Sequence, residues 1–593
     1  MIPFHDEVSE LTDNKNMILA VVLSALVLLG WTLLSDRFLP TAAPQTVKVE
    51  NGKAKPIAQP ADIAAERPQA LKSLATVLAS TPRVRIDTPS LQGSINLTGA
   101  RIDDLVLLRQ RQTIDKHSPP VRLLSPAGAP NANFASFGWT GDGLAAPGPD
   151  TVWTSNAPAL TPGRPVTLSW TGPDGQTFEQ SIAVDDDYLF TVKQRVANAS
   201  PNAMVVRPYG LVSRAAKSKD LSSWTNHVGP IGVFNGAAQY DVSFENLDGQ
   251  EPGFFGKTFG NSAKAGPNSF STDGGWVGFT DKYWLTALAP SGNSAIAASF
   301  RKAPTGAYQA DYARQPIVIP PGKEVTTETQ LFAGAKEIDA LKAYEKAGIP
   351  GFTRAIDWGW FRWFMIPIFN LLVFLFRTTG NFGVAIICLT LIVRGLMYPI
   401  AQKQFQSMAA MRKVQPKMKA IQELHKEDKP RQQQEILKLY QSEKINPAAG
   451  CLPILLQIPV FYALYKVLMV SVEMRHQPFA LWIHDLSAPD PATVLNLFGT
   501  LPFHPPGFLA IGVLPILLGV TMWMQFKLNP AQMDPTQQQI FAIMPWVMMF
   551  IMAPFAAGLQ LYWVVSNILT IAQQWWLYKR YGLDKVEPVP ATG

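Results

Sequence analysis

The residue best placed to do chemistry is Arg394, inside the apolar stretch Asn381 to Ile400, NFGVAIICLTLIVRGLMYPI. A helix needs about 20 apolar residues, at about 1.5 Å each, to cross a bilayer, so this stretch is long enough. An arginine placed within hydrocarbon costs at least about 2.5–3.5 kcal/mol on insertion scales. Arg394 must therefore be hydrated or paired, or its side chain must reach headgroups about 9 Å away.

The polar residues in the apolar stretches favour a hydrated site at Arg394. They make it less plausible that the Arg394 side chain simply extends to the lipid headgroups. These stretches contain no Asp or Glu that could act as an internal counter-ion. They carry uncharged polar residues instead: Thr390, Gln457, Gln525, Ser566, Asn567, Gln573 and Gln574. A cation among amides and hydroxyls predicts a water-filled cavity at membrane depth.

The rest of the sequence offers no enzyme or metal site. The 593 residues carry a net charge of +7 and include 2 cysteines, Cys388 and Cys451, both in apolar stretches, which excludes a disulfide framework. The large region 81–335 has two histidines, His117 and His227, without metal-ligand spacing. No GxxxxGK[ST] phosphate loop occurs. We therefore expect no catalytic residues, no metal and no cofactor.

Two N-terminal segments precede the first folded region. Met17 to Leu34 is apolar and uncharged, and its leading segment is acidic, with Lys15 as the only basic residue. Pro44 follows the small pair Ala42-Ala43, so we expect an uncleaved membrane anchor rather than a signal peptide. Residues 36–80 are rich in proline and polar residues and predict a flexible linker.

A large β-region follows, from about Arg83 to Phe332. Apolar residues alternate with polar ones along the chain, with one face formed by Tyr188, Phe190, Val192 and Val196. Turn sequences recur, including Pro173-Asp174-Gly175, Asn235-Gly236 and Asp273-Gly274-Gly275. Many short strands over about 250 residues predict an all-β sandwich that binds or braces something and is not an enzyme.

Between this sandwich and Asn381 we expect two helices. Ile338, Leu341 and Tyr344 have helical spacing, and Gly348 ends that helix. The uncharged run Trp363 to Phe376 is short for a span and contains a proline, so it predicts a helix lying along the membrane surface.

The segment Ala401 to Lys444 is the most basic, with ten Lys and Arg residues against five acids. The excess of positive charge predicts a cytoplasmic location. Its pattern predicts two helices with a turn at Glu427 to Pro430, forming a hairpin over 401–446. Two interpretations remain open: a solvated charged loop, or a docking surface for an acidic partner such as ribosomal RNA or anionic lipid.

Four more spans are expected after the hairpin, at about 447–470, 508–526, 540–555 and 558–578. With the N-terminal anchor and 381–400 this makes a polytopic helical membrane protein of six spans. An even number of spans keeps both termini and the basic hairpin in the cytoplasm and puts the sandwich outside, which in a bacterium is the periplasm.

Four motifs in the membrane part are specific enough to suggest a family. They are IVRGLMYP from 392 to 399, NPAAGCLPILLQIPVF from 446 to 461, FALWIHDLSAPDP from 479 to 491 and GLQLYWVVSN from 558 to 567. Together they make the sequence resemble the YidC/Oxa/Alb membrane insertases, over about residues 350 to 581. The anchor followed by a sandwich is similar to the Gram-negative form of that family.

This resemblance implies an insertase and chaperone that inserts and helps fold newly made inner-membrane proteins without nucleotide hydrolysis. Five spans would form a hydrophilic groove open to cytoplasm and lipid. Implied partners are nascent membrane proteins, the Sec translocon, membrane lipids and, through hairpin 401–446, the ribosome. The implied groove residues are Arg394, Thr390, Gln457, Tyr562 and Trp563, and those contacting the client helix are Ile458, Phe461 and Phe555.

Two points limit the transfer of roles. The position of Trp563 is commonly tyrosine in the family, and tryptophan has no hydroxyl acceptor. For the apolar positions, such as Ile458 and Phe461, ordinary helix packing is an alternative to client contact.

The expected domains are 1–35 (tail and anchor), 36–80 (linker), 81–335 (sandwich), 336–380 (connecting and interfacial helices), 381–581 (five-span core) and 582–593 (cytoplasmic tail). The rival functions are an ion- or proton-coupled transporter with an extracytoplasmic sensor domain, and a scaffold that assists folding beside a translocon. The absence of intramembrane carboxylates weighs against the transporter.

Overall fold

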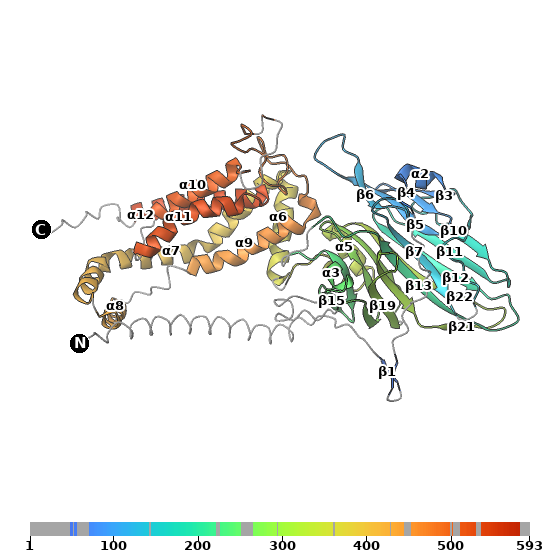
Figure 1. The fold of residues 1–593 in the computed structure, drawn as a ribbon. Helices are drawn as coiled ribbons and strands as arrows, with labels where there is room; N and C mark the ends of the chain where they lie inside the picture. Colours follow the sequence, from blue (N-terminus) through green and yellow to red (C-terminus); the bar gives the residue numbers. More distant parts are fainter. Residues whose placement is uncertain are drawn as a thin grey trace. The chain divides into compact units, whose positions relative to one another are not determined.

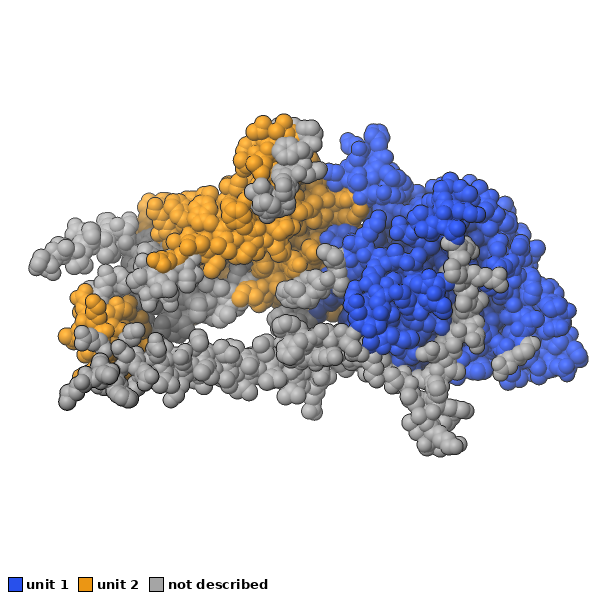
Figure 2. Space-filling view, viewed as in Figure 1, with its two compact units in different colours: residues 1–360 blue, residues 361–593 orange. Residues whose placement is uncertain are grey.

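The structure is a computed structural model that describes residues 48–50, 53–55, 70–141, 144–220, 226–250, 265–292, 295–359, 362–426, 428–443, 452–498, 501, 510–528 and 535–580. The chain divides into two compact units, Met1–Trp360 and Phe361–Gly593 (Figures 1 and 2). The predicted anchor from Met17 to Leu34 and the predicted tail 582–593 lie outside the described residues.

Short elements occur inside the predicted linker. Strands β1 (Lys48–Glu50) and β2 (Lys53–Lys55) form an antiparallel pair. Helix α2 (Leu74–Ala79) begins at Ser73, whose side chain accepts a hydrogen bond from the Thr76 backbone N–H. This N-cap satisfies one of the free amides of the first helical turn.

The first unit contains a sandwich of two sheets, as predicted (Figure 1). The 9-stranded sheet has the order β15 (Ala237–Gln239), β14 (Gly229–Phe234), β17 (Gly275–Thr280), β18 (Trp284–Pro290), β22 (Glu324–Ala335), β12 (Leu189–Ala197), β11 (Thr177–Val184), β10 (Val166–Thr171) and β8 (Thr154–Ser155). The 11-stranded sheet has the path β16 (Asn268–Asp273), β19 (Ala295–Lys302), β20 (Tyr308–Arg314), β13 (Met204–Arg214), β7 (Asn133–Thr140), β5 (Arg101–Arg111), β4 (Leu91–Asn96), β3 (Arg83–Asp87) and β9 (Ala159–Leu160). Beside this path, β21 (Ile317–Ile319) pairs with β13 and β6 (Pro120–Leu124) with β5; the β3–β9 pair is parallel.

The alternating pattern around β12 puts apolar side chains into the core. Tyr188, Phe190, Val192 and Val196 are all fully buried, which confirms the predicted face. Opposite them on β11, Phe178 pairs with Val196 in an antiparallel register. Apolar cross-strand pairs of this kind stabilise a sheet, so the period of two in the sequence explains the strand.

Contacts between the sheets show that their inner faces pack together. The rings of Trp139 on β7 and Phe178 on β11 are 5.2 Å apart in an edge-on arrangement. The buried amides of Gln180 and Gln194 donate hydrogen bonds of 2.9 Å to the backbone carbonyls of Phe137 and Gly138 on the opposite sheet. These two polar contacts fix how the sheets align, because a buried amide without a partner is costly.

The predicted turn at Asn235-Gly236 joins β14 to β15. Both residues have positive φ, 49° and 77°. The two-residue turn matches the strand twist, and asparagine and glycine tolerate this backbone conformation best.

The predicted short helix also forms, as α5 (Ile338–Lys346), and packs on the sandwich. Ile338, Leu341 and Tyr344 are its buried residues. The 3-10 helix Phe352–Ala355 follows, and the Phe352 ring lies 5.2 Å from Phe332 of β22. This segment therefore belongs to the first unit. A short helix, α3 (Phe244–Leu247), covers another part of that unit.

The second unit is helical. Its helices are α6 (Arg362–Thr379), α7 (Phe382–Leu424), α8 (Lys429–Ser442), α9 (Leu452–Val470), α10 (Val513–Leu528), α11 (Pro535–Met552) and α12 (Ala557–Arg580). Helix α7 joins the predicted span and the first helix of the basic hairpin without a break. At 43 residues it is about 65 Å long, about twice the hydrocarbon thickness of a bilayer.

Among the described residues, one segment, Phe382–Lys403, is long and apolar enough to cross a membrane. Shorter apolar helices occur at Ile458–Val470, Val513–Leu528 and Ala542–Met552. The count of six spans stays a prediction.

A connecting segment, 471–498, joins the ends of several helices in the second unit. Its backbone carbonyls at Leu486 and Ala488 accept hydrogen bonds from the first residues of α12. Asn381, the N-cap of α7, donates to the carbonyl of Phe479 at 2.8 Å. The Asp490 carboxylate accepts from Trp482 Nε1 and from two backbone amides, one of them at Leu514 in α10. The segment thus ties α7, α10 and α12 together at one end.

Candidate functional site

Arg394 lies in the apolar N-terminal half of α7, within Phe382–Lys403, and faces α12. Its Nε and Nη2 atoms donate hydrogen bonds of 3.1 and 2.5 Å to the hydroxyl oxygen of Ser566. Ser566 is buried, while Arg394 keeps partial exposure. Among the described residues no carboxylate forms an ion pair with Arg394. A guanidinium with five N–H donors that is held by one neutral oxygen retains capacity to bind an anion.

Tyr562 lies one turn before Ser566 on α12 and is 2% exposed. The spacing of four residues places both side chains on the same face of α12, the face turned to α7. The structure therefore brings the predicted residues Arg394 and Tyr562 together.

Thr390 lies one turn before Arg394 on α7 and is fully buried. Its hydroxyl donates to the Ile386 carbonyl of its own helix at 2.6 Å. This bond occupies the hydroxyl proton and leaves lone pairs on the oxygen. Thr390 thus lies in the same region as Arg394 but is turned into the helix packing.

Trp563 is half-buried and contacts α9. Its ring lies 4.9 Å from that of Phe461, at 61°. Ile458, one turn earlier on α9, is 56% exposed. Gln457 lies within α9, but its side chain is outside the described residues. The predicted residues Phe461 and Trp563 therefore form one aromatic contact between α9 and α12.

Phe555 does not lie on a helix. Helix α11 ends at Met552, and Phe555 occupies the turn into α12, with its ring 5.9 Å from that of Tyr465. The buried side chain of Gln560 shapes this turn by donating to the carbonyls of Met552 and Phe555 at 2.9 and 2.8 Å. The predicted span of 540–555 is thus too long at its C-terminal end.

A second polar contact crosses the helices beside Arg394. Asn567 on α12 donates to the Thr521 hydroxyl on α10 at 3.2 Å, and both residues are buried. Gln573 and Gln574 each have one buried side-chain atom without a hydrogen-bond partner among the described residues. Polar groups therefore follow one side of α12 for several turns from Tyr562 to Gln574.

Lys466 on α9 is a buried cation of this unit, 1% exposed, and was not among the predicted site residues. It lies inside the predicted span 447–470, so its charge in an apolar stretch was the signal that could have identified it. Ser566 was predicted as a polar residue of the spans, but sequence could not identify it as the partner of Arg394.

The basic hairpin has two arms, the C-terminal part of α7 and the whole of α8, and these arms lie side by side (Figure 1). The Tyr440 hydroxyl lies 3.2 Å from the sulfur of Met418, and Lys417 forms an ion pair with Glu443 at 2.6 Å. Met418 is buried between the arms. Since the exposed ion pair contributes little stability, the apolar contacts hold the arms together.

Two family models match the chain. The model described as "YidC periplasmic domain" matches residues 83–371, and the model described as "60Kd inner membrane protein" matches residues 374–584. The boundary between them lies close to the boundary between the two structural units.

Curated relatives match almost the whole length. The "Membrane protein insertase YidC" of Zymomonas mobilis subsp. mobilis is 47% identical over 96% of this chain and 96% of its own. The protein of the same name from Methylorubrum extorquens is 43% identical over 97% and 96%. A solved structure titled "Active YidC insertase crystal structure with the first transmembrane domain resolved" is 17% identical over 93% of this chain and 98% of its own, with a TM-score of 0.35.

Proposed function

Because the chain belongs to the YidC family of membrane protein insertases, we propose that it inserts clients along the polar surface around Arg394. It is an insertase of a non-enzymatic family, and it acts in the inner membrane. The observation that carries the proposal is the Arg394 guanidinium, which has a neutral hydrogen-bond partner and no ion pair among the described residues.

The physical task is to move a polar client tail across hydrocarbon. Each backbone group without a hydrogen-bond partner there costs several kcal/mol. A hydrated groove reaching partway through the membrane shortens the dry path, and the residues at its centre are Arg394, Thr390, Gln457, Tyr562 and Trp563. The positive charge attracts acidic residues of the tail and disfavours basic ones.

Release of the client into lipid needs no fuel. A client helix gains about 25 cal/mol for each Å² of apolar surface that leaves water. The apolar positions proposed to guide it are Ile458, Phe461 and Phe555. Ile458 is the most exposed of the three, and Phe461 is backed by Trp563, so α9 offers a firm apolar edge beside the polar site.

The proposed topology has six spans, with both termini and the basic hairpin 401–446 in the cytoplasm and the sandwich in the periplasm. Helix α6 lies along the membrane surface in this arrangement. Its buried residues Met365, Ile368, Phe369 and Leu372 fall on one face, while Trp363 is 73% exposed. The exposed face thus also carries large apolar side chains, Trp363 and Phe374, and a tryptophan near a helix end suits the membrane interface.

The proposed partners are nascent membrane proteins, membrane lipids, the Sec translocon and the ribosome. The hairpin supports the last of these, because α7 continues about 30 Å beyond a membrane span and carries α8 with it. A transporter function is not favoured, since the curated relatives are insertases over their full length.

Crosslinking of a stalled nascent chain tests the site. A photoreactive residue is placed at 390, 394, 458, 461 or 563, and at Ile568 as a control that is 51% exposed on α12. Positions 394, 458, 461 and 563 should crosslink to the client helix as it leaves the ribosome, and the buried position 390 should do so less strongly. Ile568 should crosslink mainly to lipid. Equal client crosslinking at Ile568 and at the five positions would contradict the proposed path.

A further inference from the structure

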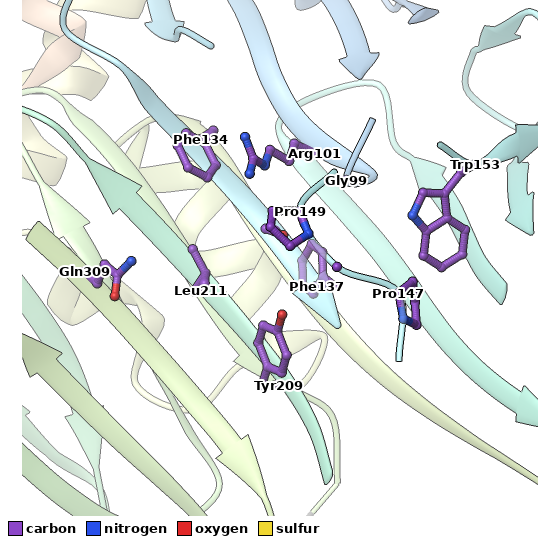
Figure 3. A pocket seen from close by; sticks show the side chains of 12 residues that line it. Gly99, Arg101, Phe134, Phe137, Pro147, Pro149, Trp153, Tyr209, Leu211 and Gln309 are labelled. Atoms are coloured by element: carbon purple, nitrogen blue, oxygen red, sulfur yellow. The ribbon is translucent and has the colours of Figure 1, made fainter. Parts of the chain in front are cut away.

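A small cleft in the sandwich, bordered by Phe134, Leu211 and Trp153, encloses about 30 Å³, room for about two water molecules (Figure 3). It is too small to bind a peptide segment or a lipid chain. A surface open to a larger partner lies instead in the helical unit, at the turn that precedes α10.

This turn, residues 493–498, has the reverse of the polarity expected at a surface exposed to water, and we call it the apolar turn. Its two polar residues, Thr493 and Asn496, are only 4% and 5% exposed. Its apolar residues are the exposed ones: Val494 (49%), Leu495 (49%), Leu497 (57%) and Phe498 (57%). A turn in water places polar side chains outward, so the pattern indicates apolar surroundings.

Hydrogen bonds inside the apolar turn show that this arrangement is built into the backbone. The N–H groups of Phe498 and Leu497 donate to the carbonyls of Thr493 and Val494 at 2.8 and 3.2 Å. Leu497 and Phe498 have positive φ, 49° and 59°, a conformation that bulky residues rarely adopt. Glycine or asparagine would fit these positions with less strain, so leucine and phenylalanine are favourable here only if their side chains gain from their surroundings.

The apolar turn is attached to the beginning of α10. Thr493 forms an antiparallel β-bridge with Gly512, and the Val513 N–H donates to the Ala492 carbonyl at 3.1 Å. The same connecting segment, 471–498, also binds the first residues of α12 and the N-cap of α7. The apolar turn therefore lies at the level where the helices of this unit begin.

Helix α10 is too short to cross a bilayer by itself. Its 16 residues span about 24 Å, whereas the hydrocarbon core is about 30 Å thick. Leu517, Val520 and Met524 are exposed along it at helical spacing, so one face is apolar. No Asp, Glu, Lys or Arg occurs in the sequence from 491 to 526. The apolar turn thus adds apolar surface at the end of α10, where the helix alone falls short.

We propose that the apolar turn inserts its exposed side chains into the lipid bilayer, at the boundary between headgroups and acyl chains beside the start of α10. Lipid is the occupant because the turn adjoins apolar helices of a protein that belongs to an inner-membrane family. The boundary is the right depth, because water there can still bind free backbone groups, whereas irregular backbone exposed to lipid does not occur deeper in the hydrocarbon. Membrane contact here is independent of the client path at Arg394.

Fluorescence quenching on the full-length protein tests the proposal. Both native cysteines are replaced by alanine, and single cysteines, Val494→Cys or Phe498→Cys, carry the environment-sensitive dye NBD. The protein is placed in nanodiscs of neutral phosphatidylcholine, where both faces are accessible. Val318→Cys is the matched control, because Val318 is an apolar residue of β21 in the sandwich and is 63% exposed. Leu517→Cys on α10 is the reference for contact with lipid.

We expect a nitroxide near the lipid headgroup to quench the dye at 494 and 498 more than a nitroxide near the end of the acyl chain. Iodide in the buffer should quench these two labels about fivefold less than the label at 318, because a hydrated ion is excluded from apolar surroundings. The label at 517 should respond to lipid nitroxides and not to iodide. Reaction of the unlabelled cysteines with a charged maleimide should follow the same order, which repeats the measurement without the dye.

A variant with Leu497→Asp and Phe498→Asp tests the cause. It should raise iodide quenching of a label at 494 to the level at 318, with the melting temperature unchanged. Unchanged protection in this variant would overturn the proposal, as would iodide quenching at 494 and 498 equal to that at 318. Protection from both iodide and lipid nitroxides would mean that protein covers the turn, either a second copy or another partner, and would also overturn it, whatever the insertion activity.

Discussion

At the scale of single residues, the charge of Arg394 predicts a selective defect. Arg394→Ala should lower insertion of clients with acidic translocated tails about five- to tenfold, the factor expected for about 1–1.4 kcal/mol of lost attraction, and should affect neutral tails less. Arg394→Lys keeps the charge and should keep the preference. Protease protection of clients in proteoliposomes measures both.

A matched variant tests whether charge or positioning matters. Ser566→Ala removes the oxygen that holds the guanidinium and leaves the charge in place. It should preserve the preference for acidic tails while lowering insertion overall. Equal loss of acidic and neutral clients in Arg394→Ala, at normal protein levels, would contradict a charge mechanism.

Asp311 in the sandwich predicts a pH dependence of stability. Burial outweighs the attraction of Arg301 and raises the pKa of Asp311 to about 6. Between about pH 4 and pH 6 the folded domain then binds more protons than the unfolded chain, so this group stabilises the fold at low pH and the contribution is lost as pH rises through 6. Asp311→Asn should remove this dependence.

The measurement is thermal unfolding of the wild type and Asp311→Asn from pH 4 to pH 7. The variant should gain stability relative to the wild type as pH rises through this window. A constant difference between the two melting temperatures would show that Asp311 does not titrate there.

Sequence could identify site residues but not their pairing. Arg394, Tyr562 and Trp563 were predicted, and the structure brings Arg394 and Tyr562 together. The Arg394–Ser566 bond joins residues 172 positions apart, and no local pattern reports such a contact. Lys466 could have been identified from its charge within the apolar stretch 447–470, as Arg394 was. Phe555 was placed on a helix because apolar residues continue past Met552 into the turn.

At the scale of elements, the segment 471–498 should be a main source of rigidity in the helical unit. Asp490 is 5% exposed and accepts three hydrogen bonds, including one from α10. Asp490→Ala leaves those donors buried without a partner, and a hydrogen bond to a charged group contributes about 1.5–3 kcal/mol. We expect a lower melting temperature in detergent. Asp485→Ala is the control and should change little, because it loses only contacts inside the segment, to Ser487 and, at 3.9 Å, to His476.

Unlike Asp490→Ala, which should lower stability, a change in the basic hairpin 401–446 should lower function and leave stability unchanged. Shortening the arms within 401–446 removes charge and reach while the spans remain. Insertion in a ribosome-coupled assay should fall strongly, while the melting temperature of the remaining helical unit should change little. Insertion of a purified client added after translation should fall less, and equal loss in both assays would argue against a ribosome-docking role.

Element boundaries were harder to predict than element types. The span at 381–400 and the first hairpin helix were expected as two elements, yet α7 is continuous through Pro399 and Pro416. A proline removes one backbone hydrogen bond and crowds the preceding turn, but the residues on either side of both prolines remain helical, so α7 does not end there. The change from an apolar to a charged pattern marks the membrane surface rather than a break in the backbone.

At the scale of the whole molecule, sequence predicted the sandwich and the helical membrane part but not the strand order. Strand β12 pairs with β22, whose residues follow it by more than a hundred positions. Turn sequences identify hairpins between neighbouring strands, whereas such long-range pairs depend on packing of the complete domain. The two sheets and their crossovers therefore had to come from the structure.

Because the sandwich and the helices form two separate compact units, we expect insertion to survive loss of the sandwich. The proposed path is built only from α7, α9, α12 and the turn before α12, all in the second unit. Deleting about residues 90–320 should therefore leave the basal insertion activity intact, with less loss than shortening hairpin 401–446.

That deletion leaves β3 and β22 with unpaired edges and exposed apolar faces, which favours aggregation. A second deletion, 81–335, removes both strands and tests the same point without them. Loss of insertion in a deletion that accumulates normally and keeps the melting temperature of the helical unit would mean that the sandwich takes part in insertion itself.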